Sequence, residues 1–368
     1  MYLSTQSSQR CYLLNYSLLF LSNKQDNEAL RGKREERMIN PKYRSFYSKK
    51  HLSTSIMKVG ITLPNLGPQA TKENILQTTI QAEKEGFDSL WTITRILWPL
   101  RPQTPYGGTP DGSLPVEYQT ALDPLDVLLY VALNTSKVSL GTSVIDMFFY
   151  TPVMLAKRYA TLDILSQGRV ISGLGIGWSK DEYQASNVPF QNRAERADEF
   201  IQAMKKIWTD DVVEFKGKYY NIPASKIDPK PIQKPHIPVY LGGFSSNTFS
   251  RIVKYDLNGW LGVAAGPLEN IENCINTIKD NATRSNKNPN NFRTIMLTYP
   301  NVVEDKSSSS DDKNRFPLSG SIDQIGSDIQ RIKAMGVDHI VFGYNFVPIG
   351  RDVTKVIDLS KELSRFAR

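Results

Sequence analysis

Arg169-Val-Ile-Ser-Gly-Leu-Gly-Ile-Gly-Trp178 is a short apolar run that ends in three alternating glycines. The run predicts a buried parallel strand over Val170–Gly175 that opens into a loop. Two interpretations of the glycines stay open. They could let the backbone approach a ligand closely, or they could relieve crowding between neighbouring strands. Taken alone, the pattern favours relief of crowding, so the choice between the two interpretations depends on the rest of the chain.

The elements just before this stretch have the form of a strand followed by a helix. Val138–Val144 is another short apolar run between turn residues, which predicts a second buried strand. Thr151 and Pro152 predict a helix start, because a hydroxyl can cap the helix and proline suits its first position. That helix is expected to end at Ser166–Gly168. The region therefore reads strand, helix, strand, which is the repeating unit of a parallel sheet.

Eight apolar segments, mostly alternating with helical segments, predict eight strands along the chain. They are Lys58–Pro64, Phe87–Ile93, Val138–Val144, Val170–Gly175, Ile237–Leu241, Gly259–Ala264, Phe292–Val303 and Asp338–Gly343. This alternation predicts an α/β fold, a (β/α)8 TIM barrel with insertion segments after strands 2 and 4. A doubly wound sheet is the alternative. It would require a glycine fingerprint after the first strand, where the chain has Leu63-Pro-Asn-Leu-Gly67 instead.

Local signals predict where several helices begin and end. Gly86-Phe-Asp-Ser-Leu-Trp91 and Gly336-Val-Asp-His-Ile-Val341 nearly repeat, and each predicts a helix that ends at glycine before a strand. Asn192-x-x-Glu195 and Ser321-x-x-Gln324 each predict a capping box at a helix N-terminus.

Charge separates residues 1–56 from the rest of the chain. This segment has ten Lys/Arg, four Asp/Glu and no sustained periodicity, whereas the remainder is close to neutral. We therefore expect a disordered basic leader over residues 1–56, or a start assigned upstream of Met57, and one barrel domain over residues 57–368. Because the basic excess lies in the leader, we do not expect nucleic-acid binding.

Metal sites and membrane insertion are not expected either. The two cysteines and three histidines lack the spacing of metal ligands. No apolar run approaches the ~20 residues that span a bilayer. We expect a cytoplasmic protein.

In a (β/α)8 barrel the functional residues lie where strands end and the following loops begin. Gly242-Gly-Phe-Ser245 stands at such a place, before a predicted helix whose positive end and free N–H groups suit a phosphate. Together with Trp91, Trp178 and Phe244, which are expected at the mouth, and with the glycines beside them, this favours a flat aromatic cofactor with a phosphate tail. Residues 99–123 form a long loop rich in proline and glycine, either a binding lid or a surface insertion.

These motifs, in this order, resemble the luciferase-like monooxygenase family of flavin- and deazaflavin-dependent (β/α)8 barrels. The matching stretches are Gly86–Trp91, Leu140–Val144, Ala160–Arg169, Gly173–Trp178 and Val239–Gly243. Asp111–Pro115 and Leu122–Pro124 further resemble the branch that uses coenzyme F420. The resemblance covers most of residues 57–368.

The resemblance implies a cofactor, its site and its partners. The cofactor would be the deazaflavin coenzyme F420, with FMN as the alternative, and the partners a small-molecule substrate and a second copy of the chain. A non-proline cis peptide at Ser143–Val144 would back the cofactor ring. The implied cofactor-binding residues are Thr94, Thr142, Ser143, Val144, Ile176, Trp178, Gly242, Gly243, Phe244 and Ser245.

Two positions depart from the family pattern. Arg95 stands where F420-dependent sugar-phosphate and alcohol dehydrogenases have histidine, and Trp178 stands where the sugar-phosphate enzymes have glutamate. Arginine is not a base at neutral pH, so the proton relay of those relatives is missing. Arg95 is the candidate catalytic residue, holding an anionic substrate or an oxyanion. A structural ion pair is an equal alternative.

Three functions remain open at this point. The first is an oxidoreductase that transfers a hydride between F420 and a small organic substrate. The second is an FMN-dependent luciferase-like monooxygenase. The third, suggested by the missing proton relay, is a non-catalytic flavin- or deazaflavin-binding protein. An open cavity beside the ring would favour an enzyme, and a filled one the binding protein.

Overall fold

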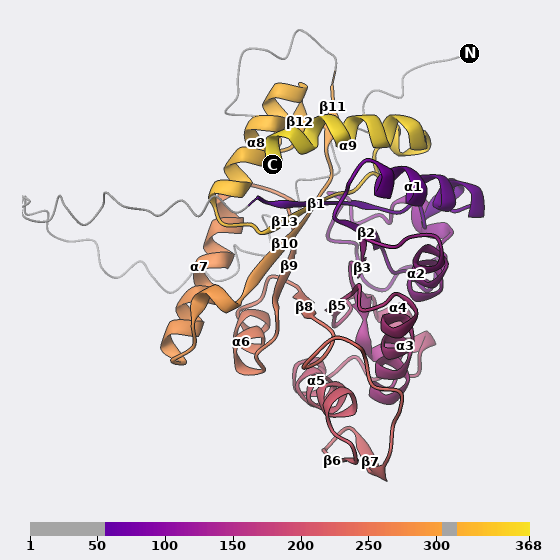
Figure 1. Cartoon of the computed structure of the whole chain (residues 1–368), viewed down its shortest axis with the longest axis vertical. Helices are drawn as coiled ribbons and strands as arrows, with labels where there is room; N and C mark the ends of the chain where they lie inside the picture. The colour runs from indigo at the N-terminus through magenta and orange to yellow at the C-terminus, as the bar shows by residue number, and fades with distance from the viewer. Residues whose placement is uncertain (1–55, 304–314) are drawn as a thin grey trace, which may run out of the picture.

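Eight parallel strands close into a barrel in the computed structural model, which describes residues 56–303 and 315–368 (Figure 1). The barrel strands are β1 (Lys58–Thr62), β2 (Ser89–Thr92), β3 (Ser139–Thr142), β5 (Val170–Gly175), β8 (Val239–Gly242), β9 (Gly259–Val263), β10 (Arg293–Thr298) and β13 (His339–Phe342). β1 pairs with both β2 and β13, and β3 pairs with β5, so the sheet has no free edge. The predicted (β/α)8 barrel is confirmed. The predicted leader lies outside the described residues except for Ile56.

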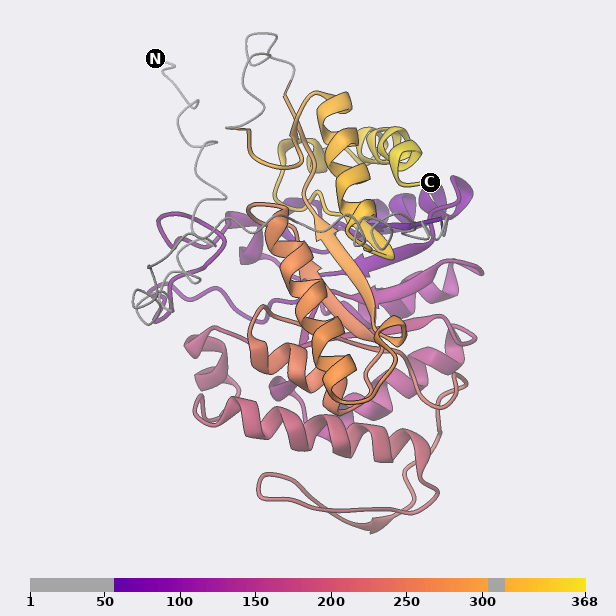
Figure 2. The same cartoon turned by 90° about the vertical axis from the view of Figure 1, so that its left-hand side faces the viewer.

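Eight helices cover the outer surface of the barrel, one after each strand. They are α1 (Lys72–Lys84), α2 (Pro124–Leu133), α3 (Pro152–Leu165), α5 (Arg193–Thr209), α6 (Ser246–Lys254), α7 (Glu269–Arg284), α8 (Ile322–Ala334) and α9 (Val353–Ala367). Figure 2 shows α7 lying along the outer side of the strands. α3 begins as predicted, with the Thr151 side chain accepting a hydrogen bond from Met154 N and proline at its first position.

The barrel interior is filled by side chains around one tryptophan. Trp91 is fully buried and packs with Leu261, Ile295, Leu297 and Val341, so it lies inside the barrel and not at the mouth, where it was expected. Its Nε1 donates to Ser89 Oγ at 2.6 Å. A Cβ on Gly141 of the neighbouring strand would lie 2.3 Å from the indole, so glycine there makes room for it. The interior is a packed core, and a ligand has to bind at the barrel mouth.

The two junctions that nearly repeat in sequence have the same backbone turn and the same type of hydrogen bond in the structure. The glycine of each has a positive φ, 77° and 94°, and ends its helix. The aspartate of each then accepts a hydrogen bond from the neighbouring strand, Asp88 from Val59 N and Asp338 from Thr294 N, both at 2.8 Å. The repeat therefore joins a helix end to the adjacent strand at two places in the barrel.

Two long segments leave the regular alternation. After β2, residues 93–123 run to the barrel mouth and contain one 3-10 turn. After β5 come α4 (Lys180–Ala185), α5 and the antiparallel hairpin of β6 (Val213–Lys216) and β7 (Asn221–Ser225). The hairpin lies at the end of the molecule opposite α8 and α9 (Figure 1). A short parallel ladder joins β11 (Asn301–Val302) to β12 (Ser319–Gly320).

Of the two predicted capping boxes, one is confirmed and one is wrong. Ser321 and Gln324 form the reciprocal bonds of a capping box at α8. Asn192 instead has a left-handed backbone, φ 57°, and its side chain makes no capping bond. The Glu195 carboxylate accepts from Tyr219 Oη at 2.7 Å rather than from the helix start. Glu195 is therefore bonded to a tyrosine 24 residues away and not to the N-terminus of its own helix.

Within residues 56–303 and 315–368, no helix has the length and apolar character needed to cross a membrane. In the same ranges, histidine, cysteine, aspartate and glutamate side chains form no cluster that could hold a metal ion.

Candidate functional site

A cavity of about 1030 Å³ lies where the barrel strands end. Nine of the predicted site residues line it, namely Thr94, Arg95, Ser143, Val144, Ile176, Trp178, Gly242, Gly243 and Phe244. They come from four separate segments of the chain, which the closed barrel brings together. The volume is at the upper end of the roughly 300–1,000 Å³ typical of small-molecule sites.

One wall of the cavity is a bulge that follows β3. The Ser143–Val144 peptide is cis, at the position the family resemblance implied. The chain then continues into β4 (Ile145–Asp146), which pairs with the end of β5. Val144 packs against two glycines, since a Cβ on Gly175 would lie 2.6 Å from Val144 Cγ2 and one on Gly242 3.0 Å from Cγ1. These glycines make room for the bulge.

The first glycine of the alternating run also relieves crowding. A Cβ on Gly173 would lie 1.9 Å from the Thr142 carbonyl oxygen. The Thr142 hydroxyl accepts from Gly173 N at 3.1 Å and is hydrogen-bonded to Tyr159 Oη at 2.7 Å. Thr142 is fully buried behind the cavity wall and does not line it. It supports the bulge from behind the wall, and its part in cofactor binding stays a prediction.

The predicted phosphate loop divides into two parts. Gly242, Gly243 and Phe244 line the cavity, and α6 starts directly after them. Ser245 does not line the cavity, because its hydroxyl caps α6 by accepting from Thr248 N at 3.2 Å. The cavity rim therefore adjoins the positive end of α6, which suits an anionic group.

Arg95 forms a buried ion pair. Its Nη1 lies 3.2 Å from Glu182 Oε2, and the two side chains are only 4% and 2% exposed. Nε donates to the Leu97 carbonyl at 3.2 Å, and the guanidinium lies 4.9 Å from the centre of the Trp178 ring. The ion-pair alternative is thus correct, although Arg95 also lines the cavity.

Three buried polar atoms of cavity-lining residues have no hydrogen-bond partner in the part of the chain that the structure describes. They are Thr94 Oγ1, Arg95 Nη2 and Asn345 Oδ1. Buried polar atoms in proteins almost always have a partner, so these three atoms are available to a polar ligand or to water in the cavity. Sequence analysis missed Asn345. Its signal was its place shortly after the last barrel strand, at the mouth.

Asp146 was expected near the barrel mouth from its place after a strand, but sequence analysis assigned it no role. It lines the cavity at the end of β4. Burial raises its pKa to about 7, with the negative charge of Glu182 adding to the effect and Arg95 opposing it. Burial also raises the pKa of Glu182, against the charge of Arg95. The cavity wall therefore carries a carboxyl that can exchange a proton near neutral pH.

The long loop after β2 closes one side of the cavity. The Tyr106 ring lies 5.3 Å from the Trp178 ring, and its hydroxyl lies 3.4 Å from Tyr118 Oη. Gln103 N donates to Asp181 Oδ2 on α4 at 3.0 Å. The loop is thus docked on α4 and lines the cavity, as a lid does.

A family model described as luciferase-like monooxygenase matches residues 57–331. The chain belongs to the luciferase-like monooxygenase family. It is 33% identical over 192 residues to an F420-dependent glucose-6-phosphate dehydrogenase of Amycolatopsis mediterranei, covering 50% of this chain and 51% of that protein. It is 32% identical over 136 residues to an FMNH2-dependent dimethylsulfone monooxygenase of Pseudomonas putida, covering 36% of this chain and 37% of that protein.

This luciferase-like chain therefore spans about half or less of the length of these two curated relatives. Among solved structures, it is similar to an F420-dependent secondary alcohol dehydrogenase in complex with an F420-acetone adduct. The TM-score is 0.67 at 20% identity, with 85% of this chain and 99% of that chain covered. At this identity the likeness shows the fold alone.

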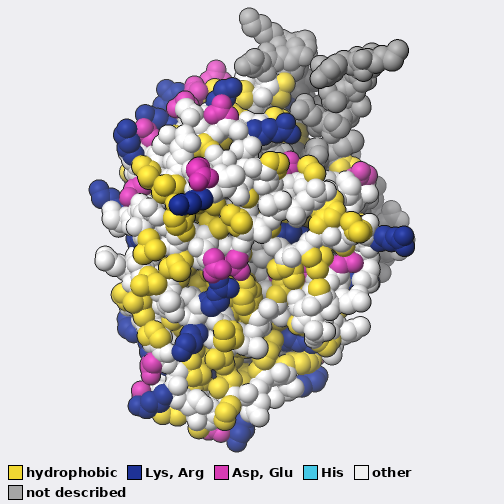
Figure 3. Space-filling model, turned by 90° about the vertical axis from the view of Figure 1, so that its right-hand side faces the viewer, with side chains coloured by type: hydrophobic (Ala, Val, Ile, Leu, Met, Phe, Trp, Pro, Cys, Tyr) yellow, Lys and Arg dark blue, Asp and Glu magenta, His cyan; other side chains and the backbone are white. Residues whose placement is uncertain are grey.

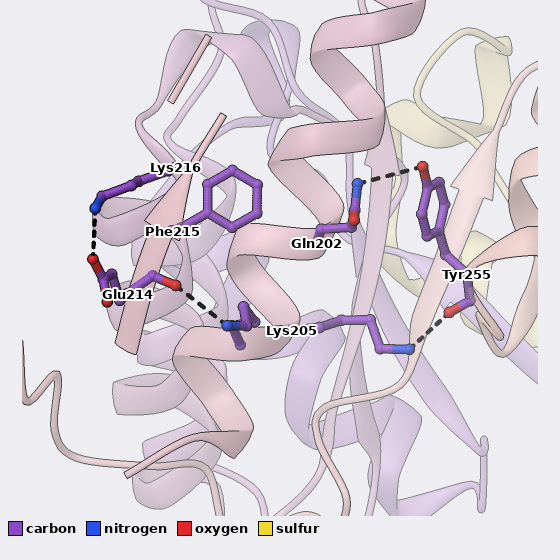
Figure 4. Close-up of a pocket in the computed structure, with 7 residues that line it drawn as sticks. Gln202, Lys205, Glu214, Phe215, Lys216 and Tyr255 are labelled. Atoms are coloured by element: carbon purple, nitrogen blue, oxygen red, sulfur yellow. Dashed lines mark hydrogen bonds and ion pairs between the residues drawn. The ribbon is translucent and has the colours of Figure 1, made fainter. Parts of the chain in front are cut away.

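The luciferase-like barrel has a second hollow, of about 410 Å³, between α5, β6 and Tyr255 (Figure 4). Its polar side chains bind neighbouring groups. Lys205 Nζ donates to the Tyr255 carbonyl at 2.7 Å, and Lys206 Nζ to the Glu214 carbonyl at 3.2 Å. This hollow gives no sign of a ligand.

Proposed function

We propose that this protein is an oxidoreductase that transfers a hydride between coenzyme F420 and a small organic substrate. The observation that carries the proposal is the open cavity at the strand ends, where glycines and aromatic rings adjoin three buried polar atoms that lack partners among the described residues. A filled site would have contradicted the enzyme, and the cavity is open.

F420 is favoured over FMN by the relatives. The one named for F420 aligns with 50% of this chain, and the one named for FMNH2 with 36%. An FMN-dependent monooxygenase remains the second candidate, because the same cavity would suit the ring of either cofactor.

The residues present fit such a cofactor. We assign its ring to the wall formed by Ser143, Val144 and Ile176, and its phosphate to Gly243 and Phe244 beside the start of α6. When bound, the coenzyme supplies or accepts the hydride. The part of the cavity under the loop of residues 99–123 is left for the substrate.

The chain's own contribution is to hold the reactants and exclude water. The docked loop covers the substrate side with Tyr106 and Tyr118. Arg95 is neutralised by Glu182, so it offers one hydrogen bond from Nη2 to a substrate oxygen rather than a free positive charge. We therefore propose that Arg95 orients a neutral polar group of the substrate, and no longer that it binds an anionic substrate.

An anaerobic assay tests the proposal. The full chain is mixed with reduced F420 and a panel of small aldehydes, ketones and activated alkenes, and the return of oxidised-F420 absorbance is followed. The proposal expects oxidation that depends on the organic substrate and needs no oxygen. Turnover that occurs only with reduced FMN and oxygen would support the monooxygenase instead.

We also propose that the protein is a homodimer. Apolar side chains are spread over the side of the molecule that α1, α2 and α3 form (Figure 3). Ile80, Leu133 and Met154 are 51%, 69% and 54% exposed there. A contiguous exposed apolar patch marks an interaction surface, and the proposal is that these side chains of neighbouring helices belong to one.

Light scattering is expected to give twice the mass of one chain, and Leu133→Lys with Met154→Lys to give monomers. Ile232→Lys is the control, because Ile232 is 51% exposed, close to the 54% of Met154, but lies outside these helices. A monomeric wild-type protein would contradict the proposal.

A further inference from the structure

We propose that Asp146 is the proton donor of this enzyme, and that its carboxyl protonates the oxygen of a carbonyl substrate while the carbonyl carbon receives a hydride. The inference rests on the proposed function and gives it a substrate class, small aldehydes and ketones. It also supplies the proton-transfer group that Arg95 and Trp178 cannot provide.

The backbone around Asp146 holds its carboxyl at the cavity wall. Asp146 ends β4, which starts right after the Ser143–Val144 bulge. The carboxylate oxygens lie 3.1 and 3.2 Å from where a Cβ on Gly175 or Gly177 would stand. Side chains at those two positions would displace the carboxyl, so the end of the glycine run leaves room for it.

The charges on this wall do not balance if both carboxyls are ionised. Asp146 and Glu182 share one buried guanidinium, that of Arg95. Glu182 takes the direct ion pair at 3.2 Å and also accepts from Ile96 N at 3.0 Å. Removing an uncompensated charge from water is costly, so one carboxyl keeps its proton.

Asp146 is the carboxyl that keeps the proton. Burial raises its pKa to about 7 and Glu182 adds to this, while Arg95 and a hydrogen bond from Gly177 N lower it. Tyr183 of α4 also faces it, and burial holds the Tyr183 hydroxyl in its neutral form. Asp146 is therefore protonated in part of the molecules at neutral pH, with a pKa near the value that favours general acid catalysis.

A second observation points to a substrate oxygen on the same wall. Arg95 Nη2 is buried, belongs to a cavity-lining residue and has no partner among the described residues. A carbonyl oxygen is an acceptor of the kind this donor lacks. Arg95 would then hold the substrate, and Asp146 would supply the proton.

The proposed step balances. The carbonyl carbon gains a C–H bond with the electron pair of a hydride that reduced F420 supplies, and the C=O π bond breaks. The oxygen takes the Asp146 proton, which yields an alcohol. Asp146 would be left as a carboxylate and would regain a proton from solvent. The coenzyme, having lost a hydride, would release one proton to solvent and be left oxidised by two electrons, so the protons balance.

The first test needs no cofactor. Infrared difference spectra of the full chain are recorded as the pH is raised from 5 to 9. We expect a carboxylic-acid C=O band that is lost around pH 7, is absent from Asp146→Asn and is retained in Asp358→Asn. Asp358 is exposed on α9 and does not line the cavity, so its variant controls for the loss of an aspartate.

The second test measures single turnover of reduced F420 with the aldehyde and ketone panel. We expect Asp146→Asn to be slower by about 100-fold or more, to lose the pH dependence of the rate and to bind F420 within about threefold of wild type. Asp146→Glu, which keeps a carboxyl, is expected to regain part of the rate.

The outcomes separate the two proposals. If wild type does not bind F420, the proposed function fails and this inference with it. If wild type binds F420 and reduces a carbonyl, but Asp146→Asn reacts at the same rate or the infrared band persists in it, only the assignment of Asp146 is overturned. If wild type binds F420 and reduces no carbonyl, the substrate class is overturned.

Discussion

Alanine at Gly173 is expected to destabilise the protein by at least about 3 kcal/mol, at or beyond the upper end of typical overpacking costs. The added Cβ would lie 1.9 Å from the Thr142 carbonyl oxygen. That oxygen belongs to the backbone of the adjoining strand and cannot rotate away as a side chain would. Relief requires β3 and β5 to separate just below the cis bulge, so the cavity wall is expected to be lost with the stability.

Urea unfolding followed by tryptophan fluorescence measures this effect. Gly107→Ala is the matched control, because a Cβ there meets no atom within 4 Å and its φ is not positive. The control is expected to stay within about 0.5 kcal/mol of wild type. Equal stabilities of the two variants would show that the close approach of Gly173 to Thr142 is not present in solution.

Methionine at Arg95 is expected to cost about 3–5 kcal/mol at pH 8, the range for breaking a buried ion pair by removing one partner. Glu182, whose side chain is 2% exposed, would be left without its counter-charge beside Asp146. Its pKa, already raised by burial, would rise further. Because the folded state then holds a proton that the unfolded state releases, stability falls as pH rises from the unfolded pKa of Glu182 to its folded one.

The cost of Arg95→Met should therefore be smaller at pH 5.5 than at pH 8, as measured by urea unfolding at both values. Arg95→Met with Glu182→Gln is the control, since it removes both charges and is expected to recover most of the stability. A single variant as stable as wild type at pH 8 would mean that water solvates Glu182 and that the pair is not buried.

The barrel could be predicted from sequence because its strands are short apolar runs separated by helical segments. The near-repeat around Asp88 and Asp338 was visible for the same reason, since each motif acts on the strand next to it. The mouth of the barrel followed from the strand ends. Most predicted site residues line the cavity because they follow those ends directly.

What sequence analysis did not show has one physical cause. In each case the residue contacts a partner from a distant segment of the chain. Thr142 lies at a strand end, but Tyr159 and Gly173 hold its hydroxyl behind the wall. The run needs glycines because its backbone packs against Thr142 and Val144, which precede it by about thirty residues. The role of Asp146 depends on sharing Arg95 with Glu182, and no local pattern shows that three charged groups share one wall.

The binding of F420 by the cavity is the central claim, and a direct binding titration tests it most directly. The full chain is titrated separately with oxidised F420 and FMN while tryptophan fluorescence is followed, since Trp178 lines the cavity. The account predicts saturable quenching by F420 with a Kd at least about tenfold below that for FMN, a difference of about 1.4 kcal/mol. Tighter binding of FMN, or binding of neither cofactor, would contradict it.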